Sequence, residues 1–139
     1  MIGSILTGKK PLISVSQATL ISEIAALLHD NRIGAVLVVE NGAILGLVSE
    51  RDICAGLHTH GAGILTALAR DIMSAPVVTT PPTTTVADAM KIMTNRRFRH
   101  LPVTEGTRIL GLVSIGDLVK RRIEEAEAEA EALKHYIAS

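Results

Sequence analysis

Two short polar motifs in this sequence combine residue types that could bind a sugar diol. Ser49 and Asp52 stand three positions apart, and Ser114 and Asp117 repeat this spacing later in the chain. An ionised carboxylate offers only acceptor atoms, so it can take hydrogen bonds from both hydroxyls of a ribose at once. The serine three positions earlier adds a donor or acceptor beside it. These four residues are therefore the candidate ribose-binding groups.

The same spacing also has a purely structural interpretation. A Ser-x-x-Asp pattern before an apolar segment is a capping box, in which the serine and the acid bond backbone N–H groups at the start of a helix. Such a cap stabilises a helix by about 1 kcal/mol. The two roles are compatible, because the serine can cap the helix while the carboxylate faces a ligand.

A second candidate is the basic run Arg-Arg-Phe-Arg-His at residues 96–100. The forked donors of an arginine side chain bind phosphate through two hydrogen bonds at once. The alternative is a solvated charge run at the end of a helix, where cations complement the helix dipole. This alternative fits Arg96 and Arg97 better than Arg99 and His100, which lie past the expected helix end. We therefore expect Arg99 and His100 to be the main phosphate-binding residues.

The motifs belong to an internal repeat, which is the first organisation to look for in any sequence. The pattern Ile-Leu-Gly-Leu-Val-Ser-x-x-Asp occupies residues 44–52 and again residues 109–117, an offset of 65 positions. Farther upstream, residues 4–7 match residues 71–74 if the first copy carries two extra residues near Lys9 and Lys10. A chance match of this length is not expected, so the chain contains two homologous halves.

The two halves differ at the basic run. The first copy has glycine and alanine where the second has Arg99 and His100, and Arg51 is its one nearby candidate for phosphate. We therefore expect the site around Asp117 to bind a phosphorylated ligand more tightly than the site around Asp52.

Each half is predicted to contain the same elements in the order βαββα. The Asn-Gly pair at residues 41–42 is a strong hairpin signal, and the flanking apolar runs favour strands. The segment at residues 58–63 is rich in Gly and His and is predicted to link the halves. The expected elements are short first strands at 12–15 and 77–79, helices at 19–31 and 84–96, hairpin strands at 35–39, 44–48, 101–104 and 109–113, and helices that begin near Ser49 and Ser114.

One half alone would leave a sheet face and two helices uncovered. The halves are therefore expected to pack together as one α/β (α+β) module with pseudo-twofold symmetry. The predicted boundaries are 1–61 for the first repeat, 62–123 for the second and 124–139 for a helical extension.

The extension is expected to continue a helix from Ile115 to about Tyr136, because the segment is rich in Ala, Glu and Leu. Its basic residues precede its acidic ones, which opposes the helix dipole. The end of the helix therefore either frays or packs against another subunit through Leu133, Tyr136 and Ile137.

Composition excludes several classes of function. The chain of 139 residues has 14 basic and 14 acidic side chains, so no overall positive charge suits a nucleic-acid backbone. With one Phe, one Tyr and no Trp, it lacks an aromatic platform for stacking bases. The N-terminus shows no signal peptide, and no apolar stretch approaches the roughly 20 residues that span a bilayer. We expect a cytoplasmic protein without nucleic-acid or membrane partners.

Cys54 is the single cysteine of the chain, so it cannot form an internal disulfide, which fits a reducing compartment. It is expected to be a small packing residue. Together with the histidines it matches no closed zinc pattern, so no metal site is predicted.

Three segments carry a resemblance to a known family: Gly-Leu-Val-Ser-Glu-Arg-Asp-Ile at 46–53, Arg-Phe-Arg-His-Leu-Pro-Val at 97–103 and Gly-Leu-Val-Ser-Ile-Gly-Asp-Leu at 111–118. They strongly resemble stand-alone bacterial proteins built from a pair of CBS domains, and the resemblance covers residues 1 to about 123. It implies clefts between the repeats that bind AMP, ADP or ATP, or in some members NAD(H) or S-adenosylmethionine. Such modules often form dimers and regulate a partner protein or an appended enzyme.

The resemblance also implies a role for individual residues. In that family the Ser/Thr-x-x-Asp motif binds ribose, and both copies here match it. Arg99 and His100 match phosphate-contacting positions, with Arg97 and Arg51 as further candidates. The segments before the first helix of each half supply apolar surface for adenine and pair across halves with the opposite aspartate; the candidates there are Ile13, Val15, Val78 and Thr80.

Three classes of function compete. A nucleotide-sensing module that acts on a separate, unnamed protein is favoured, and a structural dimerisation module with degenerate sites is the alternative. Enzymatic activity is not expected, because the sequence shows no activated nucleophile, paired acid and base, metal cluster or Walker-type glycine loop.

Overall fold

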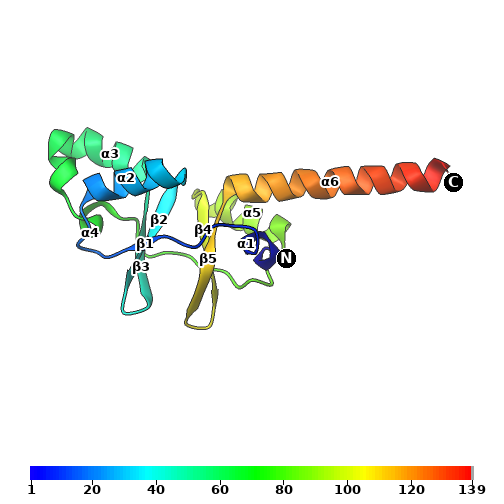
Figure 1. Ribbon diagram of the computed structural model, residues 1–139, viewed down its shortest axis with the longest axis horizontal. Helices are drawn as coiled ribbons and strands as arrows, with labels where there is room; N and C mark the ends of the chain where they lie inside the picture. Colours follow the sequence, from blue (N-terminus) through cyan, green and yellow to red (C-terminus); the bar gives the residue numbers. More distant parts are fainter. Residues whose placement is uncertain (139) are drawn as a thin grey trace. The chain divides into compact units, whose positions relative to one another are not determined.

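The structure, a computed structural model, describes residues 1–138 and divides into two compact units (Figure 1). The first-repeat unit runs from Pro11 to Val78. The second-repeat unit combines Met1–Lys10 with the chain from Thr79 onward. The N-terminal segment therefore packs with the second repeat, although it precedes the first in the sequence.

The first-repeat unit is built on a three-stranded sheet in the order β1-β2-β3, with β1 parallel and β3 antiparallel to β2. Asn41 and Gly42 have φ values of 50° and 80°, the left-handed conformation that a two-residue hairpin turn requires. The elements of this unit are β1 (Ser14–Val15), α2 (Ile21–Asn31), β2 (Ala35–Glu40), β3 (Ala43–Ser49), α3 (Glu50–His60), the 3-10 helix η1 (Gly61–Thr66) and α4 (Ala69–Ile72).

The core of this unit forms where α2 packs against the sheet. Ile21, Ile24 and Leu28 of α2 lie three and four residues apart, so they share one face of the helix, and all three are buried. The first four residues of β2 are also buried, which shows that this central strand is covered on both faces.

The second-repeat unit repeats the hairpin with the same register. β4 and β5 are antiparallel, and Val103 pairs with Gly111 as Val38 pairs with Gly46 in the first-repeat unit. The elements of this unit are α1 (Gly3–Leu6), α5 (Val86–Arg96), β4 (His100–Glu105), β5 (Arg108–Ser114) and α6 (Ile115–Ala138).

The structure confirms the predicted mixed α/β fold, the repeated hairpins and the helices that follow them. Helices α2 and α5 begin two residues later than predicted, and α6 extends to Ala138. The predicted strand at residues 77–79 does not form; a single parallel bridge joins Thr80 to Val103 instead.

The segment predicted to link the halves, residues 58–63, is helical rather than irregular. Helix α3 continues to His60, and η1 follows without a break. Gly61, with φ 59°, caps the end of α3, and Ile64 then inserts into the core with 1% of its surface exposed. The buried isoleucine fixes a segment whose Gly and His content favoured an irregular loop.

A short segment packs against a glycine of the hairpin in each unit. A Cβ on Gly46 would lie 2.6 Å from Sδ of Met73, and one on Gly111 would lie 2.8 Å from Cδ2 of Leu6. Both glycines therefore permit an approach that a side chain would block. The residues that follow Met73 and Leu6 are thereby brought to the ends of β3 and β5.

Helix α6 has 24 residues, but it carries many charges. Within residues 1–138, no helix is both long enough and apolar enough to cross a lipid bilayer.

Candidate functional site

The second Ser-x-x-Asp motif lies where β5 ends and α6 begins. The backbone N–H of Ser114 donates to Oδ2 of Asp117 over 2.9 Å, and the backbone N–H of Asp117 donates to Oγ of Ser114 over 3.1 Å. These reciprocal bonds form a capping box, so the structural interpretation of the motif is confirmed. They also hold the Asp117 carboxylate, which is 26% exposed, in a fixed position at the surface.

Lys9 forms an ion pair with this carboxylate. Its Nζ lies 2.6 Å from Oδ2 of Asp117 and also donates to the backbone oxygen of Leu112 over 2.9 Å. Burial raises the pKa of Asp117, but the hydrogen bond and charge of Lys9, with the bonds from Ser114, outweigh burial and hold this pKa below its ordinary value. Asp117 is therefore an ionised acceptor at neutral pH.

Two residues of the basic run lie beside this motif. His100 is the first residue of β4 and stands directly opposite Ser114 of β5, so their side chains share one face of the hairpin. The carbonyl of Arg99 accepts a hydrogen bond of 2.8 Å from the backbone N–H of Ile115. Strand pairing thus brings together Arg99, His100, Ser114 and Asp117, four of the residues predicted from the sequence.

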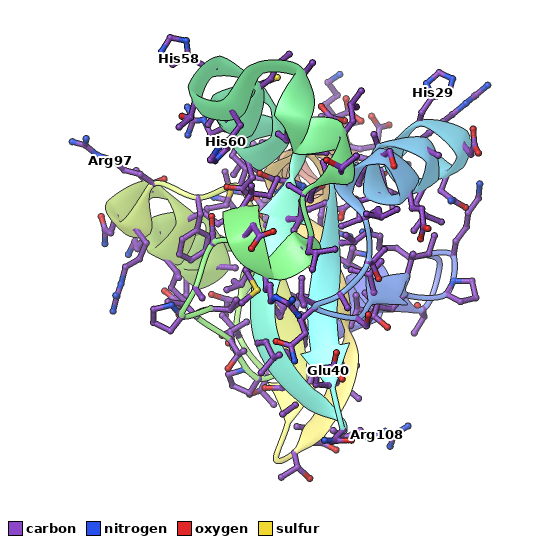
Figure 2. All side chains as sticks on the ribbon, turned by 90° about the vertical axis from the view of Figure 1, so that its left-hand side faces the viewer. His29, Glu40, His58, His60, Arg97 and Arg108 are labelled. Atoms are coloured by element: carbon purple, nitrogen blue, oxygen red, sulfur yellow. The ribbon has the colours of Figure 1, made fainter. Side chains whose placement is uncertain are left out.

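Arg97 occupies a different place. It caps the C-terminus of α5 in the left-handed conformation, with φ 58°, and its side chain extends outward into solvent (Figure 2). α5 ends at Arg96, so this pair fits the helix-end interpretation given for it above.

The first Ser-x-x-Asp motif has the same cap with an additional neutral partner. Oδ2 of Asp52 accepts from the backbone N–H and the Oγ of Ser49, over 2.8 and 3.0 Å. Oγ of Ser74 donates to the other oxygen, Oδ1, over 2.8 Å. Both oxygens of Asp52 are therefore bonded to hydroxyl or backbone donors of its own unit.

No basic side chain replaces Arg99 and His100 at the equivalent positions of the first-repeat unit. Ala35 stands opposite Ser49, and the carbonyl of Gly34 accepts from the N–H of Glu50 over 3.0 Å. Arg51 lies exposed in the first turn of α3. The local backbone is the same in both repeats, but the side chains that could meet a phosphate differ.

Two of the candidate adenine-binding residues occupy equivalent places, because Val15 pairs with Val38 of β2 and Thr80 pairs with Val103 of β4. Val15 is 8% exposed in the core beside β2, with Ile13 packed against that core. Thr80 is 4% exposed, and its Oγ1 lies 2.6 Å from Oγ1 of Thr84. Val78 is half-buried at the end of the first-repeat unit.

Sequence reasoning missed two residues of these sites, Lys9 and Ser74. The signal for Lys9 was the pair of extra residues that the repeat alignment needs at this point. Ser74 was aligned with Thr7 in the repeat, but the sequence did not show that its hydroxyl reaches Asp52.

The histidines of the first-repeat unit lie on its surface. Figure 2 shows His29 on α2 and His58 and His60 on α3, and within residues 1–138 no three metal-binding side chains gather at one point. Cys54 is exposed on α3, so its predicted packing role was wrong; Gly56 is the residue that this helix buries.

An open surface depression lies at the end of α2. Its lining residues are Leu28, His29, Asp30, Arg32, Ile33, Gly34 and Glu50, and it contains none of the predicted site residues. Its charged lining residues are Asp30, Arg32 and Glu50, so it offers no excess of positive charge for a phosphate.

The Ser-x-x-Asp caps, the paired hairpins and the packing glycines occur once in each repeat. In agreement, the family model for the CBS domain matches the chain twice, over residues 2–59 and 69–124. The chain belongs to the CBS domain family.

Relatives in the CBS family include a solved CBS-domain protein from Agrobacterium tumefaciens, 36% identical, which covers 87% of this chain and 98% of its own with a TM-score of 0.83. A mitochondrial CBS domain-containing protein from Arabidopsis thaliana is 34% identical over 115 residues, which is 79% of this chain and 56% of that protein. This chain thus spans little more than half of the plant relative. A CBS domain protein from Pyrobaculum aerophilum, solved in complex with AMP, is 28% identical, with 84% and 88% coverage and a TM-score of 0.73.

Proposed function

We propose that this CBS domain pair is a regulatory module that binds an adenine nucleotide, and that the Asp117 region of the second-repeat unit is its main site. The AMP complex of the Pyrobaculum relative supports an adenosine-type ligand. AMP is the preferred candidate, with ADP, ATP, NAD(H) and S-adenosylmethionine as other ligands of the same class.

The observation that carries this proposal is an ionised carboxylate with cations on its own unit. A nucleotide presents two neutral hydroxyls on its ribose and a negative phosphate a few bonds away. Asp117 can accept hydrogen bonds from the hydroxyls, and we assign the phosphate to Arg99 and His100, which strand pairing places beside the motif.

Without a ligand, the ammonium of Lys9 is bonded to the Asp117 carboxylate. Its bond to Oδ2 of Asp117 occupies an acceptor that a ribose hydroxyl would use. A nucleotide brings its own negative charge, so the ammonium of Lys9 can turn from Asp117 toward the phosphate when the ribose binds. Lys9 thus keeps Asp117 paired without ligand and favours phosphorylated ligands over adenosine.

We propose that binding regulates a separate protein rather than catalysing a reaction. A ligand shifts the population of two conformations only by as much as its affinity differs between them. The output therefore depends on a partner that recognises one of those conformations. A homodimer in the cytoplasm is the assembly that we expect to transmit the signal.

Calorimetric titration of AMP into the full chain tests the proposal. Asp117→Asn keeps the size of the side chain but removes the charge, and we expect AMP to bind roughly 100-fold more weakly, since it loses hydrogen bonds to a charged group. Asp71→Asn is the matched control, because the Asp71 carboxylate caps α4 in the same way, with its Oδ2 accepting a bond of 2.9 Å from the backbone N–H of Leu68 three positions earlier.

Equal loss of affinity in the two variants would show a general effect of cap removal and would contradict the ribose assignment. A thermal-shift series with AMP, ADP, ATP, NADH and S-adenosylmethionine on the same variants then ranks the ligands, because a ligand that binds only the folded state raises the melting temperature.

The second candidate function is a structural dimerisation module with degenerate sites. The hydrogen bonds of Asp52 favour it for the first repeat, because Ser49 and Ser74 already occupy acceptor positions on both oxygens. A wild-type chain that shows neither heat of binding nor a thermal shift with any of the five ligands would leave this function in place of sensing.

A further inference from the structure

The outer half of α6 lies exposed to solvent. From Ala126 to Ala138 every residue of the helix is exposed, and the helix end extends beyond the other elements of the second-repeat unit (Figure 1). An isolated helical segment of this length is marginal in water, and here Glu residues four positions apart repel one another. A partner surface would supply the missing stability.

Four of the large exposed apolar residues of α6 lie along one seam of the helix. Val119, Ile123, Leu133 and Ile137 are 40%, 54%, 59% and 74% exposed. With two alanines they recur at alternating intervals of four and three residues, which is the a/d pattern of a two-stranded coiled coil. The seam consists of Val119, Ile123, Ala126, Ala130, Leu133 and Ile137.

The charges that flank the seam select the partner. In a parallel pair, each g position faces the e position five residues later on the other helix. Arg122 and Glu129 occupy g positions, and Glu127 and Lys134 occupy e positions. A parallel pair of identical helices therefore places Arg122 against Glu127 of the other copy and Glu129 against Lys134, so all of these contacts join opposite charges.

An antiparallel pair would join like charges instead. When the seams overlap fully, Glu129 faces Glu129 of the other copy, Glu127 faces Glu127, and Lys120 faces Lys134. Like charges at these positions destabilise the pair. We propose that the seam of α6 pairs with the same helix of a second copy of this chain as a short parallel coiled coil.

This pairing is independent of nucleotide binding. The seam is short, and alanine at two of its core positions offers little apolar surface. Association through α6 is therefore expected to depend on protein concentration and to add to any contact between the CBS repeats themselves.

Cysteine cross-linking distinguishes the arrangements. Ile137→Cys, in a Cys54→Ser background that removes the exposed native thiol, should give a disulfide-linked dimer under mild oxidation, because identical a positions meet in a parallel pair. Ala128→Cys lies on the outer face of the same helix and is the matched control. Equal cross-linking of both variants, or none of either, would overturn the proposal.

Charge exchange gives a second, independent test by sedimentation of the full chain. Glu129→Lys should weaken association roughly tenfold, because it turns the Glu129–Lys134 contacts into repulsion at both sides of the pair. Adding Lys134→Glu should restore association. Glu131→Lys makes the same charge change away from the seam and should have little effect.

Failure of the double variant to recover would contradict the parallel arrangement. A wild-type mass that stays that of one chain at every concentration would overturn the pairing itself, and neither result bears on the AMP titration.

Discussion

The two repeats place the same motif at the same point of the same hairpin, yet surround its carboxylate differently. Asp52 accepts bonds from Ser49 and from the hydroxyl of Ser74, whereas Asp117 is bonded to the ammonium of Lys9. Ser74, the partner of Asp52, lies just before the second repeat in the sequence. Lys9, the partner of Asp117, lies just before the first repeat. The motif therefore fixes where the carboxylate lies, and the neighbouring segment fixes its charge environment.

The equivalence extends to the backbone. Ser74 exchanges backbone hydrogen bonds of 3.0 and 2.9 Å with Leu47, and the ammonium of Lys9 bonds the carbonyl of Leu112, which is the equivalent residue in the second repeat. The carbonyl that accepts from the backbone N–H of Ser74 in the first repeat thus has an equivalent that accepts from the Lys9 side chain in the second. The lesson is that repeated motifs with identical caps can still differ in ligand chemistry.

The largest expected difference between the repeats lies in AMP affinity. Asp117→Asn should weaken the tight site roughly 100-fold, since hydrogen bonds to a charged group contribute strongly. Asp52→Asn should leave that site within a few-fold of wild type, because Asp52 is bonded within its own unit. Calorimetric titration of the two variants side by side measures both. Loss of tight binding in Asp52→Asn alone would reverse the comparison.

The second largest difference is expected in the stability cost of substituting the two packing glycines, Gly46 and Gly111. Gly46→Ala is expected to destabilise the chain by about 2–3 kcal/mol, because its Cβ would also lie 2.9 Å from the backbone oxygen of Ser74, which cannot move freely. Gly111→Ala should destabilise it by about 1 kcal/mol, because the flexible Leu6 side chain can adjust. Urea unfolding gives both values. Equal destabilisation would show that the two contacts are equally rigid.

A smaller effect is expected from the basic run. Arg99→Ala should weaken AMP binding about tenfold and leave adenosine binding nearly unchanged, since the lost bonds go to phosphate. Arg97→Ala is the control of equal charge and should change AMP affinity less, because Arg97 points into solvent (Figure 2). If both ligands weaken together in Arg99→Ala, this side chain supports the fold rather than the phosphate.

Lys9→Met should alter ligand preference rather than remove binding. Without the ammonium on Asp117, adenosine should bind a few-fold more tightly, while AMP should gain less because it also loses a cation for its phosphate. Competition titrations with the two ligands measure the ratio. An unchanged ratio would mean that Lys9 neither competes with ribose nor meets the phosphate.

The smallest effect concerns acid stability. The pKa of Asp117 is lowered in the folded chain, so its ion pair stabilises the fold fully above the ordinary aspartate pKa, and this stabilisation is lost as the pH falls through the lowered value. Both partners are partly exposed, so the contribution should stay below about 1 kcal/mol. Melting temperatures of wild type and Lys9→Met should therefore differ more at pH 6 than at pH 3. A constant difference would assign the stabilisation to packing of the lysine stem instead.

Local patterns predicted most of the elements correctly. The Asn-Gly turn, the helical spacing of apolar residues and the Ser-x-x-Asp caps each act over a few residues, so they can be recognised without knowledge of distant contacts. The prediction of an irregular segment at residues 58–63 failed for the opposite reason. It rested on Gly and His content, while the burial of Ile64 depends on residues elsewhere in the unit.

The sequence by itself determined the two repeats, their hairpins and caps, and the difference between Arg99 and His100 in one copy and Gly34 and Ala35 in the other. Tertiary structure alone decided which segment meets each carboxylate. Lys9 reaches Asp117 across more than a hundred positions of the chain, because Leu6 packs on Gly111 and carries the following residues to the end of β5. Such contacts depend on long-range packing, which no local spacing encodes, and they set the charge around the proposed ligand.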